Sequence, residues 1–212
     1  MSAGPTEWEA HGESVGVGPH PQPWPADPRL DPELLASGDR RNVVDRYRYW
    51  RREAIVDDLD LRRFEFEVAI ENLGHDYNIG TVVRTANAFA AARVHIVGRR
   101  RWNRRGAMVT DRYQHLEHHD TVESLAEYAR TAGLTIVAVD NVPGALPLES
   151  HQLPRRSLLL FGAEGPGLSE AARAAAGMSV AIAQFGSTRS INVGVAAGIV
   201  MHAWVRDHAR NA

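Results

Sequence analysis

Three separated segments of the chain combine glycine with polar side chains of the kinds that bind small ligands and activate reacting groups. They are residues 78–84, 161–168 and 190–192. Each lies where an apolar run gives way to a predicted loop, and such loops carry the active sites of α/β proteins. Their amide, hydroxyl, carboxylate and guanidinium groups suit the positioning of a polar substrate and of a reacting hydroxyl. We therefore treat the three segments as one candidate site.

The second segment spaces its glycines as Gly-x-x-Gly-x-Gly, beginning at Gly162, directly after the apolar run 158–161. Glycine lets a backbone pass close to a flat ligand such as an adenine ring. The spacing differs from the Gly-x-Gly-x-x-Gly of a dinucleotide-binding turn, and the chain has no Gly-Lys-Ser/Thr of a phosphate-binding loop. We therefore expect a ligand without phosphates. A nucleotide-dependent α/β enzyme of another kind is the disfavoured alternative, because neither phosphate-binding loop is present. A tight turn without any ligand explains the same glycines.

Four polar residues of these segments each have a structural explanation beside the catalytic one. Glu164 is either an exposed turn residue or a carboxylate that holds an arginine in place. Ser190 and Asn192 precede an apolar helix, which they would cap unless they hydrogen-bond a ribose or orient a catalytic group. Arg84 lies on a helix of small and apolar residues, where an ion pair is the commoner reason for an arginine.

Arginine is concentrated between residues 84 and 112, where eight arginines accompany a single acid, Asp111. The net charge of -2 argues against a general nucleic-acid coat, but this distribution is strongly uneven. The planar guanidinium binds phosphate in a bidentate manner and stacks on bases. Because the chain contains no lysine, a coding bias of a GC-rich genome explains the same arginines.

Composition limits the remaining possibilities. A chain of 212 residues with 44% apolar content buries a substantial core, consistent with one domain and an appendage. The absence of cysteine excludes disulfides and thiolate zinc sites. No run approaches the roughly 18 apolar residues of a membrane span, so we expect a soluble, cytoplasmic protein. The histidine-rich run 115–119 resembles metal-ligand spacing only superficially; we expect a partly exposed strand or loop there and no metal.

Residues 1–38 are rich in Gly and Pro and lack helical or strand periodicity, which predicts a flexible leader. Residues 39–62 place apolar side chains near one helical face and predict a helical extension that docks on the domain or stacks on RNA bases. Residues 63–212 alternate short apolar runs with helical patterns. They predict an α/β domain with a mostly parallel sheet flanked by helices. Strands are expected at 66–70, 94–97, 134–139, 157–161 and 179–183, and helices at 79–92, 122–131, 169–176 and 193–206.

Taken together, the three segments resemble the signature motifs of the SpoU-type RNA ribose 2'-O-methyltransferases of the SPOUT superfamily. The first motif is Glu71-Asn72 followed by the run from Asn78 to Phe89, the second runs from Leu159 to Leu168, and the third from Ile182 to Gly198. The match covers about residues 66–206 with the motifs in order. One position departs from the family, which usually carries proline directly after the position of Ile182, where this chain has Ala183.

The resemblance implies a C-terminal deep trefoil knot, S-adenosyl-L-methionine (AdoMet) as cofactor, a homodimer whose subunits complete each other's sites, and tRNA or rRNA as substrate. The implied catalytic residues are Asn78, Arg84, Glu164, Ser190 and Asn192. The implied AdoMet-binding residues are Gly162, Gly165, Ile182, Ala183 and Ile191. For RNA contact we expect Arg99, Arg100, Arg101, Trp102, Arg104 and Arg105, together with the face 46–52. A protein that keeps this fold and binds RNA without catalysis remains the alternative.

Overall fold

The computed structural model describes residues 16–74, 77–163 and 165–209. The chain divides into two compact units, Met1–Ile55 and Val56–Ala212. The boundary falls inside helix α2 (Arg52–Asp60), close to the end of the predicted helical extension. Among the described residues, no helix is long and apolar enough to cross a membrane.

The larger unit is built on a seven-stranded sheet in the order β3-β2-β1-β6-β4-β7-β5, and every pairing in it is parallel. The strands are β1 (Glu67–Asn72), β2 (Val94–Gly98), β3 (Leu116–His119), β4 (Thr135–Val139), β5 (Leu146–Pro147), β6 (Ser157–Phe161) and β7 (Met178–Ala181). The sequence predicted β1, β2, β4, β6 and β7 to within a few residues. It left open whether residues 115–119 form a strand, and the two-residue β5 was missed because so short an edge strand has no periodicity to detect.

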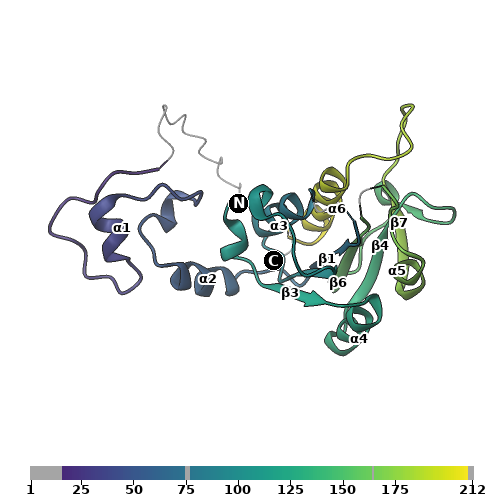
Figure 1. The fold of residues 1–212 in the computed structure, drawn as a ribbon, viewed down its shortest axis with the longest axis horizontal. Coiled ribbons are helices and arrows are strands. Elements are labelled where there is room, and N and C mark those ends of the chain that lie inside the picture. The colour runs from purple at the N-terminus through teal and green to yellow at the C-terminus, as the bar shows by residue number, and fades with distance from the viewer. Residues whose placement is uncertain (1–15, 75–76, 164, 210–212) are drawn as a thin grey trace. The chain divides into compact units, whose positions relative to one another are not determined.

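The central strands β1 and β6 are buried along their whole length, as expected for a parallel sheet that is covered on both faces. Helices α3 (Ile79–Ala88) and α6 (Val193–His208) cover one face and contribute Val82, Val83 and Trp204 to its core. Helices α4 (Val122–Ala132) and α5 (Glu170–Ala175) cover the other face. Figure 1 shows the sheet between these two pairs of helices. The predicted α/β architecture with flanking helices is therefore confirmed.

Two helices of the larger unit, α5 and α6, begin at residues that the sequence marks as caps. Ser169 precedes α5, and its hydroxyl accepts a hydrogen bond from the amide of Ala172 at 3.1 Å, as predicted. Asn192 caps α6 in the same way. α3 ends at Ala88 rather than at residue 92, and Ala90, two residues later, takes a positive φ of 52°. That left-handed residue turns the chain towards β2.

The smaller unit corrects the expectation of a leader without secondary structure, at least for residues 16–38. Helix α1 (Pro32–Ser37) forms there, with Asp31 capping it through the amide of Glu33 at 2.8 Å. Aspartate followed by proline is a helix start, but a helix of six residues is too short to show periodicity. Residues 1–15 of the predicted leader lie outside the described residues. The predicted helix near residues 39–51 is replaced by a single 3₁₀ turn, Asp45–Tyr47.

Candidate functional site

The carboxyl ends of β4, β6 and β7 surround a cavity of about 450 Å³. In parallel sheets, ligands bind at this edge, beyond the ends of the strands. Its walls come from residues 139–141, 161–163, 165–168, 181–182, 184, 189–193 and 196. Two of the three segments predicted from the sequence therefore meet at one cavity, although more than twenty residues separate them along the chain.

The glycine-rich segment makes a tight turn at the wall of this cavity. A Cβ on Gly162 would lie 2.2 Å from the carbonyl carbon of Gly167, so no larger residue fits there. The amide of Gly167 donates to the carbonyl of Ala163 at 3.1 Å, and Gly165 and Gly167 both have positive φ. The turn itself therefore requires these glycines. The predicted site residue Glu164 belongs to the same segment but lies outside the described residues.

Four of the five predicted AdoMet-binding residues line the cavity: Gly162, Gly165, Ile182 and Ile191. The fifth, Ala183, is not part of the lining. It is exposed, and its amide donates a hydrogen bond of 2.9 Å to Oε1 of Glu149. Since the neighbouring residues Ile182 and Gln184 both line the cavity, this hydrogen bond fixes the backbone of the cavity wall between them.

The predicted catalytic residues fall into two groups. Ser190 and Asn192 line the cavity, and the side-chain amide of Asn192 donates to Oδ1 of Asn78 at 3.0 Å. Oδ1 of Asn192 also accepts hydrogen bonds from the amides of Gly194 and Val195. Asn192 therefore both caps α6 and links it to the first motif. Arg84 is different, because it is exposed on α3 and does not line the cavity.

The first motif also anchors the loops around the site through two buried residues at the end of β1. Oε2 of Glu71 accepts from the amide of Ser169 at 2.8 Å, just beyond the glycine-rich turn. The side-chain amide of Asn72 donates to the carbonyls of Arg99 and Arg101, at 2.6 and 3.0 Å. One strand end therefore fixes both the turn at the cavity and the arginine-rich loop.

The arginine-rich loop packs against the start of α3. A Cβ on Gly80 would lie 2.6 Å from the amide nitrogen of Ala107, which shows how closely the two backbones approach. Arg104 forms an ion pair with Asp111 at 3.0 Å and lies over the ring of Trp102, which is half-buried against the core. Arg100, Arg101 and Arg105 are exposed. The loop therefore packs its backbone against the start of α3 and presents arginine side chains to solvent, whereas Trp102 packs partly against the core.

The second segment predicted to contact RNA, residues 46–52, lies within the smaller unit, and its side chains already make contacts there. Arg46 lies 4.6 Å from the centre of the Tyr47 ring, and Arg29 lies 4.2 Å from that of Trp50. Tyr47 is buried. These aromatic rings serve the packing of the smaller unit, which accounts for the interleaved pattern seen in the sequence.

The sequence did not single out four polar residues that line the cavity: Asp140, Asn141, Gln184 and Arg189. Asp140 and Asn141 follow β4 directly, and a polar pair after a buried strand is the pattern that identified the other segments. The Asn141 side-chain amide donates to the carbonyl of Arg189 at 3.2 Å. Oε1 of Gln184 is buried and has no hydrogen-bond partner within the described part of the chain. It is therefore an acceptor available to a donor in the cavity.

The chain is similar to known proteins in sequence and in fold. Residues 65–202 match the sequence profile of the SpoU rRNA Methylase family. The tRNA (guanosine(18)-2'-O)-methyltransferase of Escherichia coli K12 is 24% identical over 151 residues, which are 70% of this chain. The chain spans 66% of the length of that relative.

Two solved structures have a similar fold. The TrmH/SpoU tRNA modifying enzyme of A. aeolicus superimposes with a TM-score of 0.66 at 22% identity, over 75% of this chain and 83% of the other. The AdoMet-bound rRNA methyltransferase of Sinorhizobium meliloti superimposes with a TM-score of 0.62 at 25% identity, over 72% of this chain and 60% of the other.

Proposed function

The chain belongs to the SpoU rRNA Methylase family, and we propose that it transfers a methyl group from AdoMet to a ribose 2'-hydroxyl of structured RNA, either tRNA or rRNA. The observation that carries the proposal is the cavity between the second and third motifs, with Asn192 of its wall hydrogen-bonded to Asn78 of the first motif. Two similar proteins support the choice of cofactor and reaction. The S. meliloti structure is that of an AdoMet-bound rRNA methyltransferase, and the E. coli relative is a tRNA (guanosine(18)-2'-O)-methyltransferase.

The residues present fit AdoMet. The cavity has the size of a small-molecule site and is walled by apolar groups such as Ile182 and Ile191. The buried Oε1 of Gln184 needs a donor, and AdoMet carries two amino groups. Asp140 adds a carboxylate that suits an ammonium group or ribose hydroxyls. The lack of a phosphate-binding loop agrees with a ligand that has no phosphate.

AdoMet, when bound, supplies an electrophilic methyl group on a sulfonium centre. A ribose 2'-hydroxyl is a poor nucleophile, so the chain has to orient it and polarise its O–H bond. Ser190 and Asn192 stand at the cavity wall, where their polar groups would hydrogen-bond the ribose. Orientation of the two reactants supplies most of the expected acceleration, up to roughly 7–11 kcal/mol of the barrier.

Arg84 is proposed to bind the phosphate and the 2'-hydroxyl of the target nucleotide. Arginine is a cation in proteins, so its natural role is to donate hydrogen bonds rather than to accept a proton. Its exposed position on α3 is consistent with a homodimer in which Arg84 of one subunit reaches the cavity of the other. The exposed Val195 and Ile199, one turn apart on α6, would form part of the apolar contact between subunits.

Several further features are proposed on the same family resemblance. The C-terminal segment that carries β7 and α6 would thread a loop to form the trefoil knot, which brings residues 162–168 and 182–192 to one cavity. Residues 63–212 would form the methyltransferase domain, preceded by the leader 1–38 and the extension 39–62. Glu164 would complete the catalytic residues from the glycine-rich turn. The exposed arginines of the loop 99–105 would bind RNA phosphates.

The test begins with calorimetric titration of the purified protein with AdoMet and, separately, with ATP and NAD. We expect micromolar binding of AdoMet alone. The protein is then incubated with radiolabelled AdoMet and unmodified tRNA or rRNA, and the RNA is digested to nucleosides. Labelled 2'-O-methylnucleosides support the proposal. A folded protein that binds RNA but not AdoMet would instead establish the non-catalytic alternative.

A further inference from the structure

A second cluster of titratable side chains lies on the sheet face beneath α4, on strands β1, β2 and β3. His95 of β2 pairs directly with Glu117 of β3, and His119 follows Glu117 on the same face of that strand. Glu67 of β1 and Tyr128 of α4 complete the group. The cavity of the proposed methyltransferase site is lined by none of these residues.

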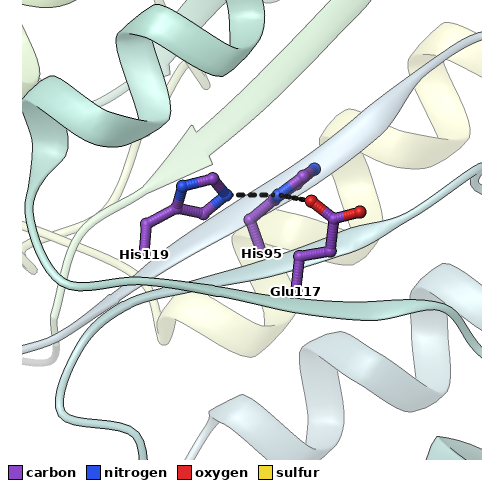
Figure 2. Close-up of side chains that lie close together, drawn as sticks. All are labelled: His95, Glu117 and His119. Atoms are coloured by element: carbon purple, nitrogen blue, oxygen red, sulfur yellow. Dashed lines mark hydrogen bonds and ion pairs between the residues drawn. The ribbon is translucent and has the colours of Figure 1, made fainter.

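Three of these side chains lie close together, and Figure 2 shows His95 between His119 and Glu117. His95 Nδ1 lies 2.9 Å from His119 Nε2 and 3.9 Å from Glu117 Oε2. One ligand atom from each residue lies within 4.8 Å of the other two. Ligands at the usual zinc distances stand about 3.3 Å apart in a tetrahedral site, so small side-chain movements would suffice to bind an ion.

The neighbouring residues prepare His95 as a ligand. Its Nε2 lies 2.7 Å from Oε2 of Glu67, and because a carboxylate only accepts, Nε2 carries the proton. Nδ1 therefore carries the lone pair of the ring and accepts the hydrogen bond from Nε2 of His119, and a bound metal ion would replace the proton of that bond. The hydroxyl of Tyr128 donates to both oxygens of Glu67, at 2.9 and 3.1 Å, and holds that carboxylate in place. A carboxylate behind a histidine is the usual support of a metal-binding imidazole.

Access and charge are also compatible with a cation. His95 is fully buried, whereas Glu117 and His119 are half-buried and open the cluster to solvent. Arg93 is bound to Oε1 of Glu117, which leaves Oε2 facing His95. The side chain of Arg93 is 40% exposed and can turn outward without leaving a buried charge.

We propose that His95, Glu117 and His119 bind a divalent transition-metal ion such as Zn²⁺, with solvent completing the coordination. Two imidazoles and a carboxylate are a common zinc-binding set. The ion would join the edge strand β3 to β2 and stabilise this side of the sheet. The proposal departs from our expectation for the run 115–119, because the third ligand comes from β2, 24 residues before His119, and spacing within the run cannot show it.

The test uses full-length protein without a histidine tag, stripped with EDTA and dialysed. Calorimetric titration with ZnCl₂ is expected to show one tight site per chain, and Co²⁺ in its place should give the intense visible absorption of a four-coordinate site. At a hundredfold excess over Kd, zinc should raise the melting temperature by about 5–10 °C.

The variants His119→Ala and Glu117→Gln should lose this binding and the thermal shift, and Glu67→Gln should weaken affinity by about 10–100-fold. His118→Ala is the matched control, because His118 lies on the same strand and its Nε2 contacts the carbonyl of Gly98 instead. Zinc binding that is absent from the wild type, or unchanged in His119→Ala, would overturn the proposal. AdoMet titration of the same samples shows independently whether the proposed methyltransferase site is intact.

Discussion

The side-chain amide of Asn192 donates a hydrogen bond to Oδ1 of Asn78 at 3.0 Å, across 114 residues of chain. The same Asn192 caps α6 through its Oδ1, and Asn78 stands directly before α3. Two helix starts are therefore fixed to each other beside the cavity. The two functions of Asn192, capping and linking, use different atoms and can be separated by substitution.

Asn192→Ala removes both functions, whereas Asn192→Asp retains an acceptor for the cap but has no donor for Asn78. We expect Asn192→Ala to lower the free energy of unfolding by about 1 kcal/mol, the usual value of an N-cap. Asn192→Asp should remain near wild-type stability yet lose most methyl transfer. Denaturant unfolding and methyl incorporation measure the two effects. Full activity of Asn192→Asp would show that the link to Asn78 is not needed.

Gly162→Ala should disrupt the cavity wall, because the added Cβ would meet the backbone of Gly167 at 2.2 Å. We expect loss of AdoMet binding by calorimetry, together with a lower melting temperature. Gly186→Ala is the matched control, since a Cβ there meets nothing within 4 Å. Equal AdoMet affinities of the two variants would mean that the turn adapts and that the glycine is dispensable.

Much of the larger unit was predictable from the sequence, for physical reasons that particular elements illustrate. The strand Ser157–Phe161 is buried on both faces, so Leu158–Phe161 is a continuous apolar run, and the predicted bounds of the strand agree with the structure. Asn192 and Ser190 were identified because polar residues interrupt apolar runs there, and both line the cavity. Such signals are local in the chain.

The features that were missed depend on contacts between distant residues. Nothing near Gln184 in the sequence indicates that its Oε1 is buried in a cavity wall. In the sequence His95 is an ordinary strand residue, and only the pairing of β2 with β3 places Glu117 opposite it. The spacing of Tyr47 and Trp50 predicted that both lie on one face of a helix. In the structure their rings pack against each other within the smaller unit instead.

Glu149 accepts a hydrogen bond from the amide of Ala183, the residue that departs from the family pattern. Proline at position 183 would have no N–H, whereas Ala183 has one and donates it to Glu149. Glu149→Ala should weaken AdoMet binding by about two- to threefold, corresponding to about 0.5 kcal/mol for an exposed hydrogen bond. Adding Ala183→Pro to Glu149→Ala should restore the affinity, because proline needs no acceptor. Calorimetry on both single variants and the double variant measures the coupling, and additive effects would contradict it.

The smaller unit should be sensitive to acid through Asp39, whose side chain is fully buried. Burial acts to raise the pKa of Asp39, but hydrogen bonds from Arg41 and from the amide of Tyr49 outweigh it, and the pKa lies below its ordinary value. A lowered pKa in the folded state gives stability that is present above the unfolded pKa of about 3.9 and is lost as the pH falls through the folded value.

Tryptophan fluorescence should therefore report a transition of the smaller unit below about pH 4. Asp39→Asn should abolish this pH dependence and lower stability at pH 7 by about 2 kcal/mol, since hydrogen bonds to a charged group are lost. Asp27→Asn is the comparison. Arg29 lowers the pKa of Asp27 to about 2, but that pair is at the surface, where ion pairs contribute little. A transition that persists in Asp39→Asn would assign the acid sensitivity to other carboxylates.

Arg84 lies outside the cavity of its own chain, so its proposed function depends on a second subunit. Arg84→Ala should reduce kcat by about 100-fold, as expected when a charged donor is removed from a reacting group. AdoMet affinity should not change, because Arg84 does not line the cavity. Arg84→Lys keeps the charge without the planar fork and should recover only part of the rate.

Arg130→Ala is the matched control for Arg84→Ala, because it also removes one exposed arginine but lies on α4. The decisive measurement mixes Arg84→Ala with Asn192→Ala subunits. If Arg84 of one subunit serves the cavity of the other, the heterodimer pairs one doubly impaired site with one intact site and regains about half of the wild-type rate per site. If each chain uses its own Arg84, both sites of the heterodimer carry one defect and the mixture stays inactive. Near-normal turnover of Arg84→Ala alone would remove Arg84 from the mechanism altogether.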